Sequence, residues 1–328
     1  MNDIVITSRI RLARNLSDVP FTIKMNDYDA ANVIERVKSV ILKNKQYHFD
    51  FLEIKKLPLI KRQVLIEKHL ISPALASSKI KSAVAIDQNE NISIMINEED
   101  HLRIQVLYRG QQIQKAWEDA NRIDDFLEQH LPYAYDETWG YLTSCPTNVG
   151  TGLRASFMLH LPALTLLGYM KEIINTITKL GIAVRGFYGE GSEAAGNLYQ
   201  ISNQITLGQP EEDIIANVVS ITNQIIEQEQ QARLRLLNEN RSFVEDKVYR
   251  AYGILKYARN ISSNEALKLI SEVRMGISMG IIKETTIDKL DVLLSLIQPA
   301  IIQDYFGREM TPEERDIKRA ELIRKILE

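Results

Sequence analysis

Short runs of β-branched and other apolar residues recur through the first two-thirds of the chain. Six of them fall into three neighbouring pairs: 84–86 with 92–96, 141–143 with 155–159, and 182–184 with 198–202. The polar segment 87–91 between the first two runs predicts a hairpin turn. Neighbouring strands joined by short links pair antiparallel, so the pattern predicts an antiparallel sheet.

Helical periodicity separates these pairs, over residues 28–43, 113–129 and 163–180. Helices set between strand pairs favour an α+β fold in which helices flank the sheet. From Pro210 onward nearly every segment has a helical pattern. Its predicted helix starts are Pro210 followed by Glu211 and Glu212, the capping-box candidate Ser262 with Glu265, and Thr311 with Pro312 and Glu314. The 328 residues therefore predict two domains, an α+β domain over 1–235 and a smaller all-helical domain over 236–328.

The composition is that of an ordinary globular protein, with 45% apolar and 25% charged residues, which excludes global disorder. The formal net charge of −3 argues against direct nucleic-acid binding. A single cysteine cannot form an internal disulfide, and together with five scattered histidines it gives no zinc-binding spacing. The sequence has neither a signal-peptide pattern nor an apolar run of about 20 residues, so we expect a cytoplasmic protein without a membrane partner.

Two arginines on one strand are the first candidates for chemistry. An extended chain over residues 8–14 projects Arg9 and Arg11 to the same face. Ile10 and Leu12 then take the opposite face. Two neighbouring guanidinium groups suit a polyphosphate. The alternative is a solvated strand edge that is protected by charge.

Two polar segments follow predicted strands. The acidic run 98–100 needs a nearby cation, unless it forms the acidic first turn of a helix. The only cysteine, Cys145, enters a loop rich in Thr, Asn and Gly whose backbone amides allow a ligand to approach, and Arg154 opens the next strand. The alternative is an inert buried cysteine, although polar neighbours favour a functional one.

A third loop, over residues 186–193, carries Glu190 and Glu193 between glycines. It is a candidate to close over a substrate or, alternatively, a hairpin loop with solvated acids. His69 is a candidate to place its ring against a nucleotide base, but a lone histidine is also typical of a structural residue.

Together these segments resemble the phosphagen (guanidino) kinase superfamily. The matches occur in family order: the arginine pair at 8–11, N-E-E-D-H-L-R at 97–103, C-P-T-N-x-G-T at 145–151 and G-E-x-x-E at 189–193. The strings at 141–162, 185–208 and 315–320 are further similar to the bacterial protein-arginine kinase branch. With the helical tail, that likeness covers essentially the whole chain.

The resemblance implies transfer of the γ-phosphoryl group of ATP, with Mg²⁺, to a guanidinium nitrogen. It implies that Glu99 clamps the guanidinium and accepts its proton, and that Cys145 lies beside it as a thiolate. The second carboxylate is Glu190 or Glu193, and the protein-kinase branch points to Glu190. The implied ATP-binding residues are Thr7, Ser8, Arg9, Ile10, Arg11, His69, Arg103, Arg154, Ala155, Ser156, Phe157, Met158, Arg185, Gly186, Phe187, Tyr188, Gly189 and Glu190. Among them Arg9, Arg11, Arg103 and Arg154 form the phosphate cradle, and no residue is expected to ligate a metal.

Two departures from the small-molecule members bear on the substrate. Tyr188 stands where those members carry an arginine, and Arg185 is the candidate to supply the missing charge. Those members also carry a helical domain ahead of the arginine strand, whereas seven residues precede Ser8 here. An uncovered site suits arginine residues on proteins. A kinase of free arginine or another small guanidino compound is one alternative, and a non-catalytic phosphoarginine-binding adaptor is the other.

The predicted C-terminal helix offers a second site. Arg315 and Arg319 lie four residues apart on one face, with Asp316 alongside. The resemblance implies that they form, with Ala320, a regulatory phosphoarginine pocket. The alternative is an amphipathic helix with surface ion pairs.

The resemblance also implies a role in protein quality control and heat-shock regulation. The implied partners are proteins with accessible arginines, a Clp-type protease, a heat-shock repressor and a zinc-binding activator. A homodimer or higher oligomer through the helical domain is expected from its apolar residues Ile254, Leu255, Leu293, Leu294 and Ile297.

Overall fold

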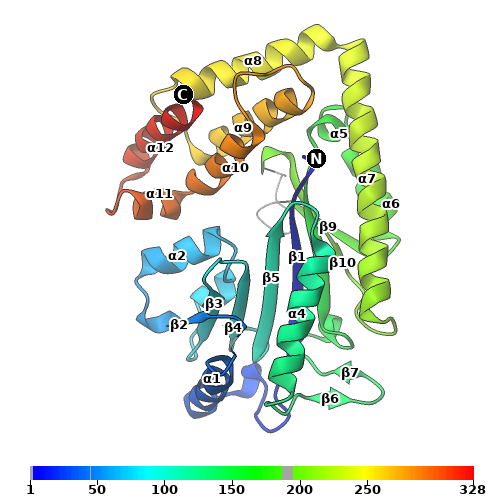
Figure 1. Cartoon of the computed structure of the whole chain (residues 1–328), viewed down its shortest axis with the longest axis vertical. Helices are drawn as coiled ribbons and strands as arrows, with labels where there is room; N and C mark the ends of the chain where they lie inside the picture. Colours follow the sequence, from blue (N-terminus) through cyan, green and yellow to red (C-terminus); the bar gives the residue numbers. More distant parts are fainter. Residues whose placement is uncertain (1–2, 45, 187–194) are drawn as a thin grey trace.

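The computed structural model describes residues 3–44, 46–186 and 195–328. Its centre is an eight-stranded antiparallel sheet in the order β2-β3-β4-β5-β1-β8-β10-β9 (Figure 1). The strands are β1 (Val5–Arg14), β2 (Phe49–Glu53), β3 (Ala83–Asp87), β4 (Ile92–Ile96), β5 (Leu102–Arg109), β8 (Leu153–His160), β9 (Ile182–Gly186) and β10 (Leu198–Asn203). The predicted α+β class is confirmed.

Two of the three predicted strand pairs are confirmed, because β3 pairs with β4 and β9 pairs with β10. The pairing of 141–143 with 155–159 is wrong. Strand β7 (Gly140–Tyr141) pairs instead with β6 (Tyr135–Asp136), and β8 lies between β1 and β10. The reason is a non-local pairing: β1 inserts between β5 and β8, and neither neighbour is close to it in sequence.

One face of the sheet carries most of the apolar core. Ile10 and Leu12 of β1 point into it and are 0% exposed. The helices α1 (Asp27–Ile41), α4 (Ile113–Glu128) and α7 (Glu211–Glu239) pack against this face. The prediction of one continuous helix over 163–180 is wrong. It is broken into α5 (Pro162–Leu166) and α6 (Met170–Thr178), because the backbone turns at Gly168 with φ of 77°.

On the opposite face, the described residues form an apolar cover at one end. There α2 (Leu59–Glu67) and α3 (Pro73–Ala76) enclose a smaller apolar cluster that includes Val84, Ile86 and Met95 from β3 and β4. Side chains alternate along a strand, so the same strands serve both cores. The central strands beyond this cluster present a polar face, on which the candidate site lies.

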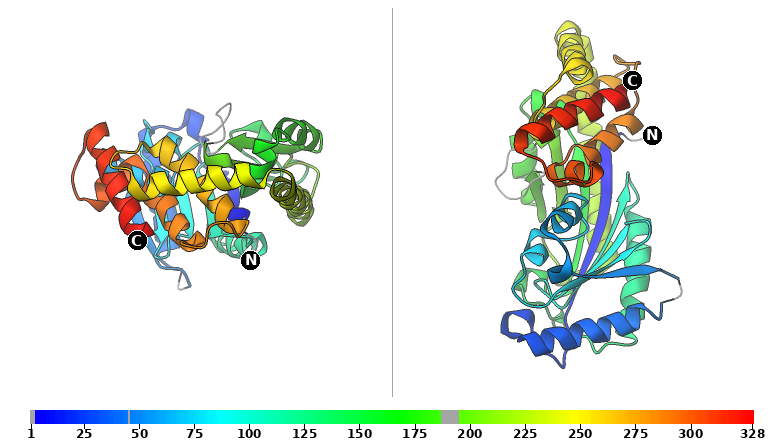
Figure 2. Two further views of the ribbon diagram at one scale, coloured as in Figure 1. Left: turned by 90° about the horizontal axis from the view of Figure 1, so that it is seen from above. Right: turned by 90° about the vertical axis from the view of Figure 1, so that its left-hand side faces the viewer.

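The chain that follows α7 is helical, as predicted. Its helices are α8 (Arg241–Tyr257), α9 (Ser263–Ser278), α10 (Ile287–Leu296), α11 (Pro299–Tyr305) and α12 (Pro312–Leu327), with the short turns η1 (Thr22–Lys24), η2 (Ile54–Lys56), η3 (Pro146–Asn148) and η4 (Ala195–Asn197) elsewhere. The helices α8 to α12 gather at the end of the sheet where β1 begins (Figure 2).

Helix starts follow the predictions closely. The capping box of Thr311 with Glu314 is present. Ser262 caps its helix by accepting from the Glu265 amide. Pro210 is the N-cap residue rather than the first helical residue, so α7 begins at Glu211. Helix α7 runs to Glu239, through the predicted boundary between 235 and 236.

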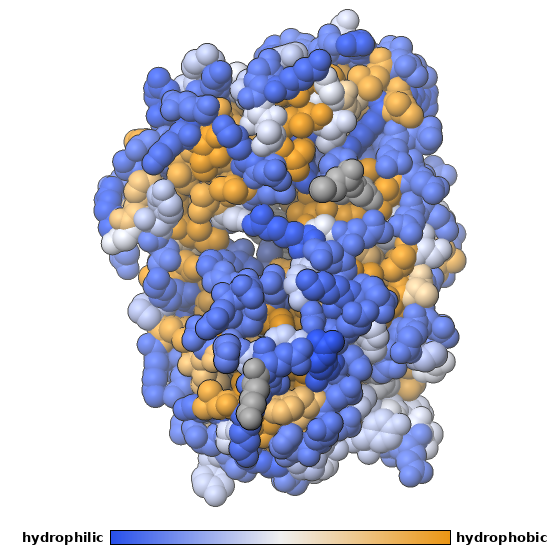
Figure 3. Space-filling model, viewed as in Figure 1, coloured by the Kyte–Doolittle hydropathy of each residue, from blue (hydrophilic) through white to orange (hydrophobic). Residues whose placement is uncertain are grey.

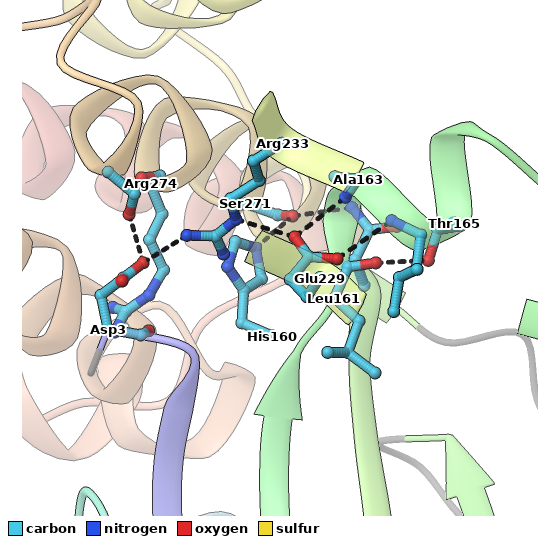
Figure 4. A network of polar contacts seen from close by, with 12 residues as sticks. Asp3, His160, Leu161, Ala163, Thr165, Glu229, Arg233, Ser271 and Arg274 are labelled. Atoms are coloured by element: carbon cyan, nitrogen blue, oxygen red, sulfur yellow. Dashed lines mark hydrogen bonds and ion pairs between the residues drawn. The ribbon is translucent and has the colours of Figure 1, made fainter. Parts of the chain in front are cut away.

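A buried polar network joins the helices to the sheet (Figure 4). Glu229 of α7 is 0% exposed and accepts from the Ala163 and Leu164 amides at the start of α5. Arg233 pairs with Glu229 and with Asp3, at 2.8 Å each. Burial of an unpaired charge would be costly, so these reciprocal contacts stabilise the start of β1 against α7.

The apolar residues that suggested a dimer lie mostly in the core. Leu255, Leu293 and Ile297 are at most 1% exposed, and Leu294 packs against the same core. Only Ile254 of this set is exposed, at 43%. The argument for a dimer from these residues is therefore wrong, because they stabilise the packing of the helices within one chain. Figure 3 shows that the apolar surface on the viewed side is divided into patches by hydrophilic side chains.

Within the described residues, every helix is too short or too polar to cross a bilayer.

Candidate active site

Four arginines share the polar face of the sheet. The register aligns Arg11 of β1 with Arg154 of β8 and with Gln105 of β5, and aligns Ala13 with Arg103. Arg9 lies two residues before Arg11 and therefore on the same face. The predicted cradle of Arg9, Arg11, Arg103 and Arg154 is thus brought together by three adjacent central strands.

The electrostatics of this cluster indicate an anion site. Burial lowers the pKa of Arg9 to about 10, and the charges of Arg103 and Arg154 act in the same direction. Burial lowers the pKa of Arg11 well below its ordinary value, and the charges of Arg9, Arg103 and Arg154 add to the effect, while Glu98 opposes it. The Arg11 Nε is buried and has no hydrogen-bond partner among the described residues. A polyphosphate would supply both the missing acceptor and the missing negative charge.

The acidic run forms the tight turn between β4 and β5, which excludes a helix start. The Asn97 amide donates to the His101 carbonyl at 3.0 Å, and Asn97 itself has φ of 59°. Glu98 accepts from both Arg103 Nη1, at 2.9 Å, and Ser72 Oγ, at 2.5 Å. Its carboxylate therefore holds Arg103 in the cradle.

Glu99 points elsewhere and is exposed. Burial raises its pKa, and the charges of Asp100 and Glu98 raise it further, while Arg103 and a hydrogen bond with Cys145 act in the opposite direction. Cys145 therefore lies close enough to act on the Glu99 carboxylate, so the two residues that were predicted to hold the guanidinium are neighbours. A carboxylate with a raised pKa is a better proton acceptor.

Hydrogen bonds to the Asp100 carboxylate fix the start of the Cys145 loop. The Asp100 carboxylate is 3% exposed and accepts from the Ser144 amide at 2.7 Å and from Asn15 at 2.6 Å. The Cys145 Sγ lies 3.0 Å from Thr147 Oγ1. Gly150, with φ of 108°, allows the loop to pass close to Thr206, where a Cβ atom would lie 2.3 Å from a carbonyl oxygen. The thiol is thus held at a set position rather than buried as inert packing.

This loop separates two hollows. One, of about 360 Å³, is lined by Glu98, Glu99 and Ser144. The other, of about 460 Å³, is lined by Thr147, Asn148, Arg154 and Arg185, together with residues of β9 and β10. The hollow with the two glutamates suits a cation and the arginine-lined hollow suits an anion, and along the chain Cys145 lies between Ser144, which lines the first, and Thr147, which lines the second. The arrangement can therefore bring a guanidinium and a phosphate together.

His69 lies next to the arginine cluster. It follows α2 in a left-handed conformation, with φ of 60°, and its carbonyl accepts from Gln105 Nε2 at 2.7 Å. Burial lowers the pKa of His69 to about 4, and the charge of Arg9 acts in the same direction. The ring is therefore neutral at pH 7 and adds no further positive charge.

The other predicted ATP-binding residues divide by face. Thr7, Ser156 and Met158 lie on the same face of the sheet as the arginines. Arg185 of β9 aligns with Gln200 of β10. Ile10, Ala155 and Phe157 point into the core and are 0% exposed, so a nucleotide would reach only their backbone. Ser8 also points away, and its hydroxyl donates to the Gly110 carbonyl at 2.6 Å. Gly186 ends β9. Outside the described residues lie Phe187, Tyr188, Gly189, Glu190 and Glu193.

The predicted phosphoarginine residues lie on α12, beside α2. Arg319 is 1% exposed and donates to the carbonyls of Ile297 and Ile261 and to Asp316, at 2.7, 2.9 and 2.5 Å. Ala320 is 1% exposed. Arg315 is half-buried, and its charge and that of Arg319 act on the carboxylate of Glu67. In this conformation Arg319 connects helices within the chain.

Three contributors to the site were given no role of their own from the sequence, although the acidic run that contains Glu98 was expected to need a nearby cation, which is Arg103. Glu98 fixes Arg103, Ser202 Oγ accepts from Arg154 at 3.0 Å, and Thr147 contacts the thiol. Each is a polar residue next to a motif, and only the pairing of strands and loops distinguishes it from a solvated neighbour.

The geometry agrees with comparisons to known proteins. Residues 32–232 match the model of the ATP:guanido phosphotransferase C-terminal catalytic domain. Among solved structures, a lombricine kinase has a TM-score of 0.63 at 21% identity, covering 70% of this chain and 67% of its own. The duplicated taurocyamine kinase of Schistosoma mansoni has a TM-score of 0.64 at 20% identity, covering 86% and 47%. The fold and site thus define a phosphotransferase of the ATP:guanido class.

Relatives with higher sequence identity indicate which family within this class the chain belongs to. Residues 241–328 match the model of the protein-arginine kinase McsB C-terminal domain. A protein-arginine kinase of Halothermothrix orenii is 53% identical over 98% of this chain and 92% of its own. One of Caldanaerobacter subterraneus subsp. tengcongensis is 50% identical, over 98% and 96%. The chain belongs to the protein-arginine kinase family of ATP:guanido phosphotransferases.

Proposed function

We propose that this chain transfers the γ-phosphoryl group of ATP to the guanidinium of arginine residues in proteins. The observation that carries the proposal is that Glu99 and Cys145 are neighbours beside a hollow lined by Glu98 and Glu99, while four arginines share the polar face of the sheet. Relatives that match this chain over nearly their whole length are named protein-arginine kinases, which supports a protein substrate.

In the proposed reaction the arginine cradle holds the triphosphate. Arg9, Arg11 and Arg154 face the phosphates, and Arg103 is aimed by its ion pair with Glu98. Phosphoryl transfer proceeds through a loose transition state, so that positioning and charge neutralisation are the main contributions of the protein. Guanidinium groups provide both, because each is a fixed fork of donors.

The acceptor requires a different contribution. A protonated guanidinium has no lone pair to offer, so a proton must leave as the N–P bond forms. Glu99 accepts this proton while the bond from the γ-phosphorus to the ADP oxygen breaks. The Cys145 sulfur lies beside the guanidinium and fixes its orientation. A second carboxylate, from Glu190 or Glu193, completes the clamp.

Mg²⁺ is the proposed companion of ATP. Among the described residues, no group of three or more His, Cys, Asp and Glu side chains is placed to hold a metal ion. The arginine-lined face fits a nucleotide polyphosphate, and Mg²⁺ bound to it would neutralise charge on the transferring group.

Regulation and cellular role extend the proposal. We infer that Arg315, Asp316, Arg319 and Ala320 bind phosphoarginine, and that the domains divide near residue 235. A role in protein quality control with a Clp-type protease, a heat-shock repressor and a zinc-binding activator rests on family resemblance. Rearrangement of Arg319 would be needed to free its donors, since they bind backbone carbonyls here.

The test compares two acceptors. An unfolded arginine-rich protein and free arginine are each incubated with MgATP that carries a labelled γ-phosphate, and the products are separated at neutral pH because N–P bonds are labile in acid. Transfer to the protein, lost by a factor of about 10² to 10⁴ in Glu99→Gln, is the expected result. Transfer to free arginine alone would instead assign the chain to small guanidino compounds.

A further inference from the structure

The acidic hollow beside Glu99 has an apolar wall that the proposed chemistry does not use. Its volume is about 360 Å³, and Ile23 and Ile80 line it together with Glu98, Glu99 and Ser144. This lining combines carboxylates with hydrocarbon, as an arginine side chain combines a cationic head with a three-carbon stem.

Ile23 stands out on this wall because its side chain is 88% exposed. It lies in the turn η1, between Thr22 and Lys24, where the Lys24 amide donates to the Phe21 carbonyl at 2.8 Å. The Thr22 hydroxyl donates to the backbone carbonyl of Glu99. The turn is therefore attached to the residue that bears the catalytic carboxylate, and the exposed isoleucine has a set position beside it.

Opposite Ile23, the wall is formed by the segment that follows α3. Ile80 is half-buried and packs against the large apolar core, which limits its movement. Lys79 also lines the hollow, and its carbonyl accepts from Lys55 Nζ at 2.6 Å.

We propose that Ile23 and Ile80 bind the aliphatic stem of the acceptor arginine and thereby direct its guanidinium to Glu99 and Cys145. This inference rests on the proposed function and adds to it a specificity determinant for the acceptor. The stem would leave water against two branched side chains, while the head meets the carboxylates. The same wall disfavours a lysine, whose point charge sits on a longer stem and cannot form the planar fork.

The test is the kinetics of Ile23→Ala with two unstructured peptides, one with arginine between glycines and one with arginine between leucines. Loss of the stem contact raises KM for both peptides by about five- to tenfold and leaves KM for ATP unchanged. Ile23→Val retains most of the contact and gives an intermediate KM. Leu42→Ala, at an exposed leucine at the end of α1, is the matched control.

Three results would overturn the inference. An unchanged KM in Ile23→Ala would show that the side chain does not touch the acceptor. A rise for the leucine-flanked peptide alone would assign Ile23 to neighbouring residues rather than to the stem. A wild-type enzyme that phosphorylates neither peptide nor protein would overturn the proposed function itself. Unaltered stabilisation of Ile23→Ala by ADP checks that the variant is folded.

Discussion

At the scale of single residues, the site concentrates positive charge that a fold would otherwise avoid. Arg9, Arg11, Arg103 and Arg154 lie on one face of the sheet, and the carboxylate of Glu98 pairs with Arg103. Repulsion among them, together with burial, lowers the pKa values of Arg9 and Arg11. Such a cluster destabilises the free protein and is relieved when an anion binds.

Replacing Arg11 therefore has opposite effects on stability and on binding. Arg11→Met removes one buried charge and keeps the bulk of the stem, so the midpoint of thermal unfolding rises by about 2–4 °C without ligand. Stabilisation by saturating ADP falls by more than half. Differential scanning fluorimetry measures both. Arg250→Met, at a surface arginine of α8, is the control, and a lower midpoint for Arg11→Met without ligand would contradict the account.

A second effect at this scale concerns pH. His69 has a pKa of about 4 in the folded chain against an ordinary 6.5, because it is buried beside Arg9. The unfolded chain binds the proton first, so stability is lost as pH falls from about 6.5 to about 4. In His69→Asn, the loss in this window is smaller by up to about 1.4 kcal/mol per pH unit. Urea unfolding at several pH values measures it, and His48→Asn at an exposed site should follow the wild type.

At the scale of elements, α2 connects the nucleotide face to the helical region. Glu67 at its end accepts from the Ala300 and Ile301 amides at the start of α11, at 2.9 and 2.8 Å. His69, two residues later, adjoins Arg9. Lys61 pairs with Asp304 at 2.5 Å, and Val64 packs against Ala300 and Ile301. A shift of α11 would therefore move the end of α2 beside the cradle.

Removing the Glu67 carboxylate should loosen this contact. Glu67→Ala leaves two buried amides without their acceptor, which costs about 1–2 kcal/mol. Hydrogen exchange at Ala300 and Ile301 should accelerate, while exchange in the central strands stays unchanged. Glu53→Ala, at a surface residue paired with Lys56, is the control. Equal protection of these two amides in Glu67→Ala and the wild type would contradict a stabilising role for the contact between Glu67 and α11.

The elements also show what the sequence could predict. Local hairpins, amphipathic helices and caps such as Thr311 depend on neighbouring residues, and these predictions are confirmed. The insertion of β1 between β5 and β8 depends on pairs such as Arg14 with Leu102 and Arg11 with Arg154, which are far apart in the sequence, so no local pattern indicates it. Strand alternation is local, so the shared face of Arg9 and Arg11 could be predicted. The support of Arg103 by Glu98 and the proximity of Glu99 to Cys145 depend on how strands and loops are assembled, so they could not.

At the scale of the whole molecule, the antiparallel sheet and the helices that follow α7 are joined by buried polar contacts. The sheet presents the arginines, and the helices α8 to α12 cap one end of it through the network around Arg233 and Asp3 (Figure 4). The distinction between core and interface residues could not be predicted from apolar character alone. Leu255 and Leu293 are apolar residues that would suit an interface between chains, but they are buried in the core formed by the helices of this chain.

The account's central claim is that this arginine face and the Glu99–Cys145 pair form an N–P bond on a protein. Phosphorus-31 NMR at neutral pH, on an arginine-rich unfolded protein incubated with MgATP and the chain, tests it directly. The account predicts a phosphoramidate resonance that grows as ADP appears, disappears on acidification, and is absent in Glu99→Gln. A product with phosphorus only on hydroxyl oxygen, or an equal rate of phosphoramidate formation by Glu99→Gln, would contradict it.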